Sequence, residues 1–159
     1  MTLDDVPLRP LEPSFVAVLR AQALMAAAPL LALAAAAEFA IRARGGPMGL
    51  VILPAALWAL WSVLLAPQRR WRRWSFAFTG EELHVARGWW THAHTVVPVR
   101  RVQHIDLTRG PLERRHDLAT LVLHTAGTEH ARVVVPGLAR AEAEAVRDAI
   151  RGSIEREER

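Results

Sequence analysis

Two strongly apolar stretches dominate the first part of the chain. From Ala21 to Ile41 the only strongly polar residues are Gln22 and Glu38, and the run from Met48 to Ala66 carries no charge. A helix of about 20 residues, rising ~1.5 Å per residue, matches the ~30 Å hydrocarbon core of a bilayer. We therefore predict membrane spans at residues 21–41 and 48–66, and the short connection makes them antiparallel neighbours in a 21–66 hairpin.

Two alternatives to membrane spans fit the sequence less well. A cleaved signal peptide would have a basic segment before its apolar run, whereas this chain has Asp4 and Asp5. A buried pair of soluble helices would need a larger protein around it. The carboxyl group of Glu38 is a functional candidate because it lies within a span. It is also one turn from the outer end, so we predict a structural role at the interface or in a pair with Arg42.

A cluster of arginines follows the second span directly. The positive-inside rule then places both termini in the cytoplasm of a multi-pass protein of the cell membrane, the inner or plasma membrane. Arginines at headgroup depth, with tryptophans among them, orient and anchor a protein. We predict a membrane-interface anchor formed by Arg69, Arg70, Trp71, Arg72, Arg73 and Trp74.

Beyond this cluster the apolar positions alternate, which is typical of strands. Trp74, Phe76 and Phe78 share one face, and a turn at Thr79 and Gly80 follows. Further strands are predicted at 92–97, 102–107, 118–124 and 132–135, separated by glycine and proline. Such short, regularly spaced strands suggest a small barrel or sandwich.

The period becomes helical after Pro136 and Gly137. Leu138, Ala141, Ala145, Ala149, Ile150 and Ile154 are predicted to form the apolar stripe of a C-terminal amphipathic helix. We assign residues 69–155 to this β-rich domain and residues 1–20 to a flexible or interfacial N-terminal segment. The fold class is therefore a membrane α-helical hairpin plus an antiparallel β-domain with a C-terminal helix.

Composition narrows the chemistry. The chain has no cysteine, which excludes disulfides, thiolate nucleophiles and thiolate metal ligands, and it has no lysine, so all 20 basic residues are arginine. Asparagine and tyrosine are also absent, a pattern that indicates coding bias. The net charge is only +4, several arginines serve topology, and no aromatic residues interleave with the basic loop. We therefore expect no nucleic-acid partner.

Several motifs occur together in the β-rich region. They are Val99 to Asp106, Gly110-Pro111-Leu112 with Arg114-Arg115, Leu118 to Leu121, Thr125-Ala126-Gly127 and Pro136-Gly137-Leu138. Their order and spacing resemble the membrane-flanked, YdbS-like family of bacterial pleckstrin-homology (PH) domains, over roughly Arg69 to Ile150. The resemblance implies a bent antiparallel sandwich or barrel, capped by a C-terminal helix, with a transmembrane pair before it. Two departures are Asp117, where the family commonly has glycine, and the Trp89-Trp90 pair at a hairpin tip.

No catalytic set is recognisable, so we predict no enzyme, no cofactor and no metal site. The chain has seven histidines, and His92 and His94 would share a strand face, but zinc needs three or four convergent ligands. Gln103 and His104 lie at the centre of the family motif, where a partner contact and a framework hydrogen bond are both open. The predicted partner or lipid surface comprises Arg100, Arg101, Gln103, His104, Arg109, Arg114 and Arg115.

These features favour a non-enzymatic membrane protein whose cytoplasmic PH-like domain acts as an adaptor or scaffold for a membrane protein complex. Its expected partners are membrane lipids together with another membrane protein or a second copy of itself. The alternative is a sensor of anionic lipid surfaces that acts through its arginine-rich loop. An inositol-phosphate pocket is not expected, because Glu81 and Glu82 occupy the first hairpin.

Overall fold

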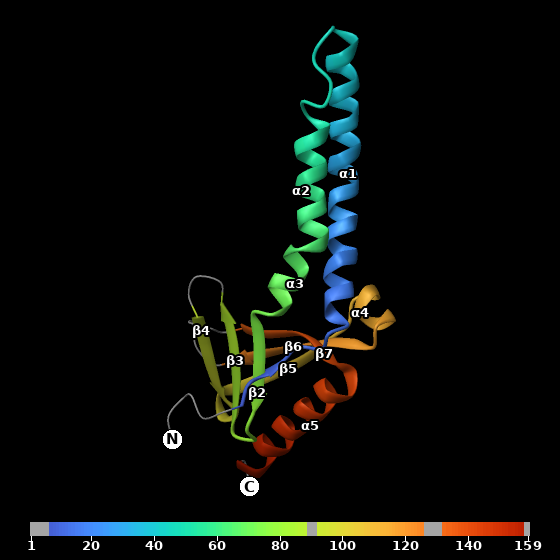
Figure 1. The fold of residues 1–159 in the computed structure, drawn as a ribbon. Helices are drawn as coiled ribbons and strands as arrows, with labels where there is room; N and C mark the ends of the chain where they lie inside the picture. Colours follow the sequence, from blue (N-terminus) through green and yellow to red (C-terminus); the bar gives the residue numbers. More distant parts are fainter. Residues whose placement is uncertain (1–6, 89–91, 126–131, 158–159) are drawn as a thin grey trace. The chain divides into compact units, whose positions relative to one another are not determined.

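The chain folds into two compact units, each described here by itself. The computed structural model describes residues 7–88, 92–125 and 132–157. One unit is helical and spans Val16–Arg70; the other is β-rich and combines the segment up to Phe15 with the chain from Trp71 onward. Figure 1 traces both units in sequence colours. The Trp89-Trp90 pair lies outside the described residues.

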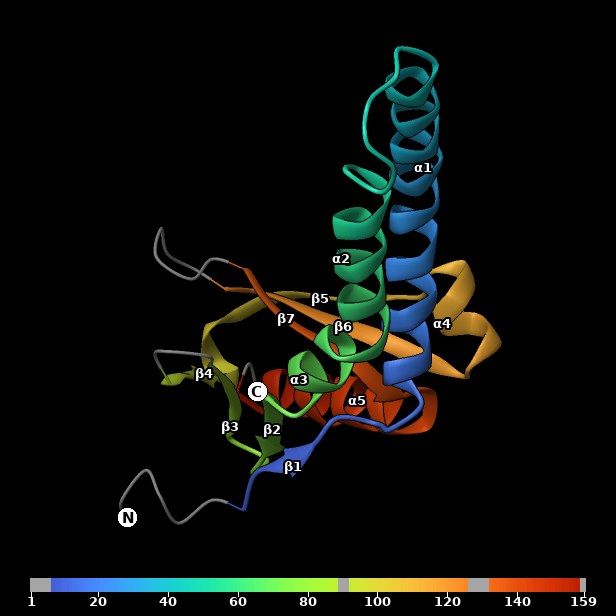
Figure 2. The same cartoon turned by 45° about the horizontal axis from the view of Figure 1, so that its top comes forward.

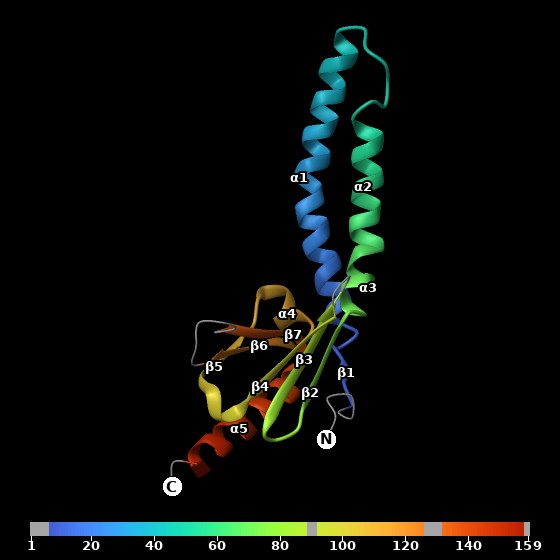
Figure 3. The same ribbon diagram turned by 90° about the vertical axis from the view of Figure 1, so that its left-hand side faces the viewer.

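The helical unit contains one helix of membrane-spanning length. Helix α1 (Phe15–Ala43) has 29 residues and includes the whole predicted span 21–41. It is the one described helix that is long and apolar enough to cross a bilayer. Helix α2 (Ile52–Leu64) has 13 residues, about 20 Å at ~1.5 Å per residue. Figures 1 and 3 show α1 and α2 side by side.

The second predicted span is therefore not one continuous helix. The stretch 48–51 forms a turn, α2 ends at Leu64, and α3 (Ala66–Trp71) begins after Leu65. Pro67 explains this break, because proline has no N–H group for the carbonyl one turn earlier and its ring crowds that carbonyl. The pattern of apolar residues alone did not reveal it.

Glu38 joins the two helices of this unit. Its carboxylate accepts hydrogen bonds from the backbone N–H groups of Gly49, Val51 (3.0 Å) and Ile52 (3.4 Å), at the start of α2. The predicted partner was Arg42 or the membrane interface, whereas the Arg42 guanidinium instead lies 3.6 Å from the sulfur of Met48. An acid can cap a helix in this way because the first N–H groups of a helix lack partners.

Two antiparallel sheets form the β-rich unit. The first has the order β1 (Arg9–Pro10), β2 (Trp74–Phe78), β3 (Glu82–Gly88), β4 (His92–Pro98). The second has the order β5 (Val102–Thr108), β6 (Leu118–Thr125), β7 (Arg132–Ala139). Short helices η1 (Val99–Arg101) and α4 (Pro111–Arg115) flank β5, and helix α5 (Arg140–Glu157) follows β7. This is the antiparallel, helix-capped arrangement that the sequence predicted.

The core of this unit lies between the sheets and α5. Leu83 and Val85 come from the first sheet, Leu121 and Val135 from the second, and Ile150 from α5; all are buried. Helix α5 contacts η1 and all three strands of the second sheet. Figure 2 shows α5 lying against the second sheet, and Figure 3 shows the two sheets from the side.

The start and buried face of α5 differ from the prediction. Strand β7 continues through Pro136 and Gly137, and α5 begins only at Arg140. Proline is tolerated there because β7 is an edge strand. The buried positions of α5 are Ala143, Val146 and Ile150, while Ala141, Ala145 and Ala149 are exposed. Alanines therefore misled the assignment of the apolar stripe, because a methyl group buries little area on either face.

Part of the N-terminal segment is ordered against the β-rich unit. Residues 1–20 were predicted to be flexible or interfacial, yet Arg9 and Pro10 pair with Phe76 and Ser75 of β2. The Trp71 indole N–H donates to the carbonyl of Leu11 at 2.9 Å, and the Glu12 N–H donates to the carbonyl of Gly137 at 3.0 Å. These hydrogen bonds hold the segment in place.

Candidate functional site

The arginines predicted to form one surface lie at two ends of a strand. Arg100 and Arg101 belong to η1, before β5, whereas Arg114 and Arg115 close α4, after β5. The seven residues of β5 span about 23 Å at ~3.3 Å per residue. All four side chains are exposed, but they are not gathered into one cationic patch.

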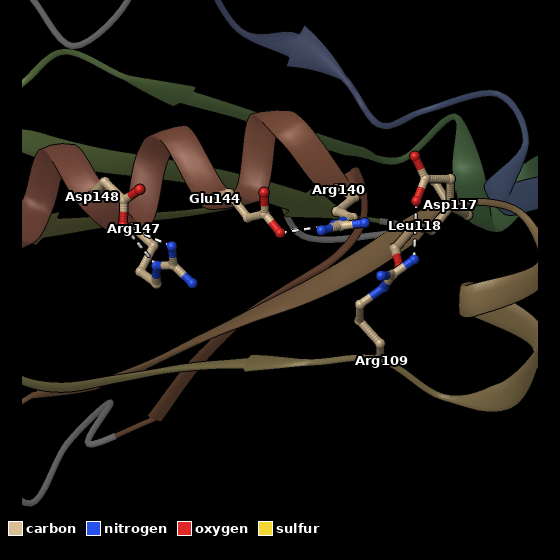
Figure 4. A network of polar contacts seen from close by, with 7 residues as sticks. All are labelled: Arg109, Asp117, Leu118, Arg140, Glu144, Arg147 and Asp148. Carbon is tan, nitrogen blue, oxygen red and sulfur yellow. Dashed lines mark hydrogen bonds and ion pairs between the residues drawn. The ribbon is translucent and has the colours of Figure 1, made fainter.

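Arg109 has a structural position within the predicted surface. Its Nε donates to the carbonyl of Leu118 at 3.0 Å, and its NH2 group pairs with the carboxylate of Asp117 at 3.0 Å. Its side chain is 23% exposed, and Figure 4 shows it pointing into the junction of β5 and β6. Arg109 therefore holds the two strands together rather than facing a partner.

Gln103 and His104 line a groove that sequence reasoning did not identify. The β5–α5 groove is open, has a volume of about 430 Å³, and is lined by Gln103, His104, Ile105, Arg147, Arg151 and Ile154. The three α5 residues are spaced i, i+4, i+7, so they lie on one helix face. The sequence contains a signal for this wall, since Arg147 and Arg151 lie beside Ile150, a residue of the predicted apolar stripe.

Local features of β5 expose the wall of this groove. Among the strands that the structure describes, β5 lies at the edge of its sheet and pairs only with β6. Its register skips between Val102 and His104, so Gln103 has no partner residue on β6. The extra residue of such a bulge is left out of the ladder with β6, whereas the opposite edge of β5 is accessible because β5 is the outer strand of its sheet.

Positive charge dominates the α5 wall. Arg147 pairs with its neighbour Asp148 at 2.8 Å, a contact that Figure 4 shows. Arg151 has no ion-pair partner among the residues up to Ile154 whose side chains the structure describes. Nearer the start of α5, the Arg140 guanidinium donates to Glu144 at 2.8 Å. This hydrogen bond lowers the pKa of the Glu144 carboxyl and raises the pKa of Arg140.

The histidines make contacts within the sheets. His104 and His124 both approach Asp106, at 2.9 Å and 3.3 Å. His84, which is buried, lies 3.4 Å from a ring nitrogen of His94 and 3.3 Å from the Glu82 carboxylate. In the part of the chain that the structure describes, no group of three or more histidine or acidic side chains is arranged to hold a metal ion. The side chain of His92 lies outside that part.

A second hollow lies at the tip of the first hairpin. It has a volume of about 760 Å³, and Glu81, Glu82 and Arg100 are among its lining residues. The two carboxylates would repel a phosphate that approached Arg100.

The predicted membrane-interface anchor is divided between the two units. Arg69 and Arg70 are exposed on α3, and Arg72 is exposed just after it. Arg73 and Trp74 are half-buried, and Trp71 is tied to Leu11 by its indole hydrogen bond. Trp71 therefore has a role in holding the N-terminal segment that the sequence did not reveal.

The chain is similar in sequence to a known membrane protein and to a family of bacterial domains. The chain is 34% identical over 98 residues to UPF0699 transmembrane protein YdbS of Bacillus subtilis (strain 168), a match that covers 60% of this chain and 60% of that protein. No solved structure matches it significantly. The family model described as "Bacterial PH domain" matches residues 16–154, which include nearly all of α1, strands β2 to β7 and most of α5. The chain therefore belongs to the bacterial PH domain family.

Proposed function

We propose that this chain is a non-enzymatic integral membrane protein that presents its PH domain to a partner as an adaptor. The observation that carries the proposal is the β5–α5 groove, an accessible strand edge beside two arginines, on a chain that also contains a membrane-length helix. Such an edge suits recognition of another chain, because its unpaired backbone groups are ready to form hydrogen bonds.

Membrane insertion of both α1 and α2 is part of this proposal. Large apolar side chains point outward from both helices: Leu33 is 68% and Phe39 77% exposed on α1, and Leu53 is 62% and Leu57 68% exposed on α2. Water would penalise so much exposed apolar surface, whereas lipid would cover it. The apolar run 48–66 has 19 residues, so α2 with its flanking turns is long enough for a second span.

The topology is tested with single cysteines, since the chain has none of its own. Arg44→Cys places a thiol in the exposed turn after α1, and Arg115→Cys places one on α4 of the PH domain. A membrane-impermeant maleimide added to intact cells should label the turn only. The PH-domain thiol should react after permeabilisation. Equal labelling of both sites in intact cells would contradict a hairpin with a cytoplasmic domain.

The adaptor role is tested by crosslinking in the native membrane. A photoreactive amino acid at Gln103 faces the groove, and the matched control at Ala145 is exposed on the opposite face of α5. The proposal predicts a defined membrane protein attached at Gln103 and absent at Ala145. Attachment of lipid alone would favour the sensor of anionic lipid surfaces, and the same products at both positions would reject the adaptor role.

A further inference from the structure

The β5–α5 groove has two chemically different walls and a small apolar part between them. One wall is the free edge of β5 at Gln103, His104 and Ile105; the other is the α5 face with Arg147 and Arg151. Ile105 and Ile154 supply the apolar part. Figure 4 shows the Arg147 side chain pointing from α5 toward β5, the strand that precedes Arg109.

The spacing of the two arginines fits an extended chain. Four residues of helix separate them by about 6 Å along the axis of α5. Alternate residues of a β-strand lie about 6.6 Å apart on the same face. A strand that ran along the groove could therefore direct side chains at positions i and i+2 to Arg147 and Arg151.

The charges on the groove walls determine which side chains of an incoming strand would bind there. Of the acidic groups on the two walls, Asp148 already pairs with Arg147, and Asp106 is held by His104 and His124. Among the residues whose side chains the structure describes, which end at Ile154, Arg151 has no acidic partner. An incoming carboxylate would thus meet the two guanidinium groups that line the groove, and guanidinium groups bind carboxylates through paired hydrogen bonds.

We propose that the β5–α5 groove binds an extended acidic segment of a partner protein, which adds to β5 as a further strand and presents alternate carboxylates to Arg147 and Arg151. This inference rests on the adaptor function proposed above and names the chemistry of its partner. Backbone hydrogen bonds to β5 supply the orientation, and the arginines supply the preference for aspartate or glutamate at every second position.

Binding is measured with the full-length protein in lipid nanodiscs. The probe is a fluorescent eight-residue peptide in which valine and glutamate alternate, and a peptide with glutamine in place of glutamate is its neutral match. The glutamate peptide should bind more tightly, and its affinity should fall as salt rises. Arg147→Glu with Arg151→Glu should weaken binding about tenfold or more, because two attractions become repulsions.

Arg87→Glu with Arg132→Glu is the matched control, since it changes the net charge equally and lies on exposed positions of β3 and β7, outside the groove. It should leave peptide binding within about twofold of the unchanged protein. An equal loss of peptide affinity in both double variants would show a general effect of net charge and would reject the groove as the binding site. A melting temperature measured for each variant separates lost binding from lost folding.

Strand addition is tested by blocking the backbone of the peptide. Successive residues of a strand direct their N–H groups to opposite edges. Methylating the N–H groups of the valines blocks one edge of the peptide, and methylating those of the glutamates blocks the other. One pattern should abolish binding and the other should not. Equal affinities for both methylated peptides would overturn the added strand.

The outcomes separate this inference from the adaptor role. If a defined membrane protein crosslinks at Gln103 with equal yield in the Arg147→Glu/Arg151→Glu variant, the adaptor role stands and the acidic segment is rejected. If the peptide binds as expected but no protein crosslinks in the native membrane, the groove stands and the adaptor role fails. If the protein forms a dimer that the Arg147→Glu/Arg151→Glu variant abolishes, a second copy of this chain occupies the groove, and the proposal of a different partner protein is rejected.

Discussion

Gly137 is predicted to be indispensable for packing the N-terminal segment on the PH domain. Its φ is +67°, a conformation that costs a residue with a side chain roughly 1–2 kcal/mol. A Cβ at this position would also lie 2.3 Å from Cγ of Phe15, whose buried ring closes over the glycine. Overpacking of this kind costs about 1–3 kcal/mol. Gly137→Ala should therefore destabilise the domain by roughly 2–5 kcal/mol.

The magnitude can be divided experimentally into its two causes. Gly80 also has positive φ, +94°, but no atom lies within 4 Å of a Cβ built on it. Gly80→Ala is therefore the matched control and should cost only about 1 kcal/mol. Thermal unfolding in detergent, followed by tryptophan fluorescence, should show a Tm loss of roughly 10–20 °C for Gly137→Ala and about 5 °C for Gly80→Ala.

A double-mutant cycle identifies the ring as the cause. Phe15→Ala removes the obstacle at a cost of its own, because the ring is buried. In that background Gly137→Ala should cost about as much as Gly80→Ala, which leaves a coupling of roughly 1–3 kcal/mol between the two positions. Equal losses for the two alanine variants in the unchanged protein, with no coupling to Phe15, would refute the reasoning.

Three other predictions follow from specific contacts. Asp117 has a φ of +51° and a 76% exposed side chain, so Asp117→Gly should match or exceed wild-type stability, while Asp117→Ala should lose about 1–2 kcal/mol in thermal unfolding. Glu38→Ala removes the acceptor for three N–H groups of 49–52, and hydrogen exchange of those amides should rise while that of α1 near Ala27 does not. The hydrogen bond from Arg140 lowers the pKa of the Glu144 carboxyl, so this pair stabilises the fold fully above pH about 4.5, the ordinary pKa of the group. The stabilisation is lost as the pH falls through the lowered pKa. The difference in unfolding free energy between the unchanged protein and Glu144→Gln should therefore disappear at that low pH.

The strands were predictable because the alternation of apolar and polar residues and the positions of the turns indicate the same elements. Alternation at Trp74, Phe76 and Phe78, then at Leu83 and Val85, sets which side chains enter the core, and the register of β2 with β3 follows from the intervening turn. Helix α4 was missed because Gly110 and Pro111 indicate a break. The carboxylate of Glu113 accepts hydrogen bonds from the Gly110 N–H at 2.7 Å and from the Thr120 hydroxyl at 2.6 Å. These bonds stabilise the first turn of α4, so Pro111 begins a short helix instead of ending an element.

The groove was harder to predict than the fold, because it depends on an alignment of segments far apart in sequence. Gln103 and His104 were singled out from their motif, but nothing local shows that Arg147 and Arg151 face them. That placement follows from the packing of Ile150 against the second sheet, which fixes the rotation of α5 and brings its neighbours beside β5. The separation of Arg100 and Arg101 from Arg114 and Arg115 likewise depends on β5 being extended.

A groove of this size is suited to a partner that is already nearby. About 430 Å³ accommodates a few residues of an extended chain, and contacts of that extent give weak affinity between freely diffusing molecules. Confinement to one membrane raises the effective concentration of two tethered partners, so a weak contact becomes sufficient and stays reversible. The proposed anchor and the proposed groove are thus parts of one mechanism, since the helices would supply the proximity that the groove requires.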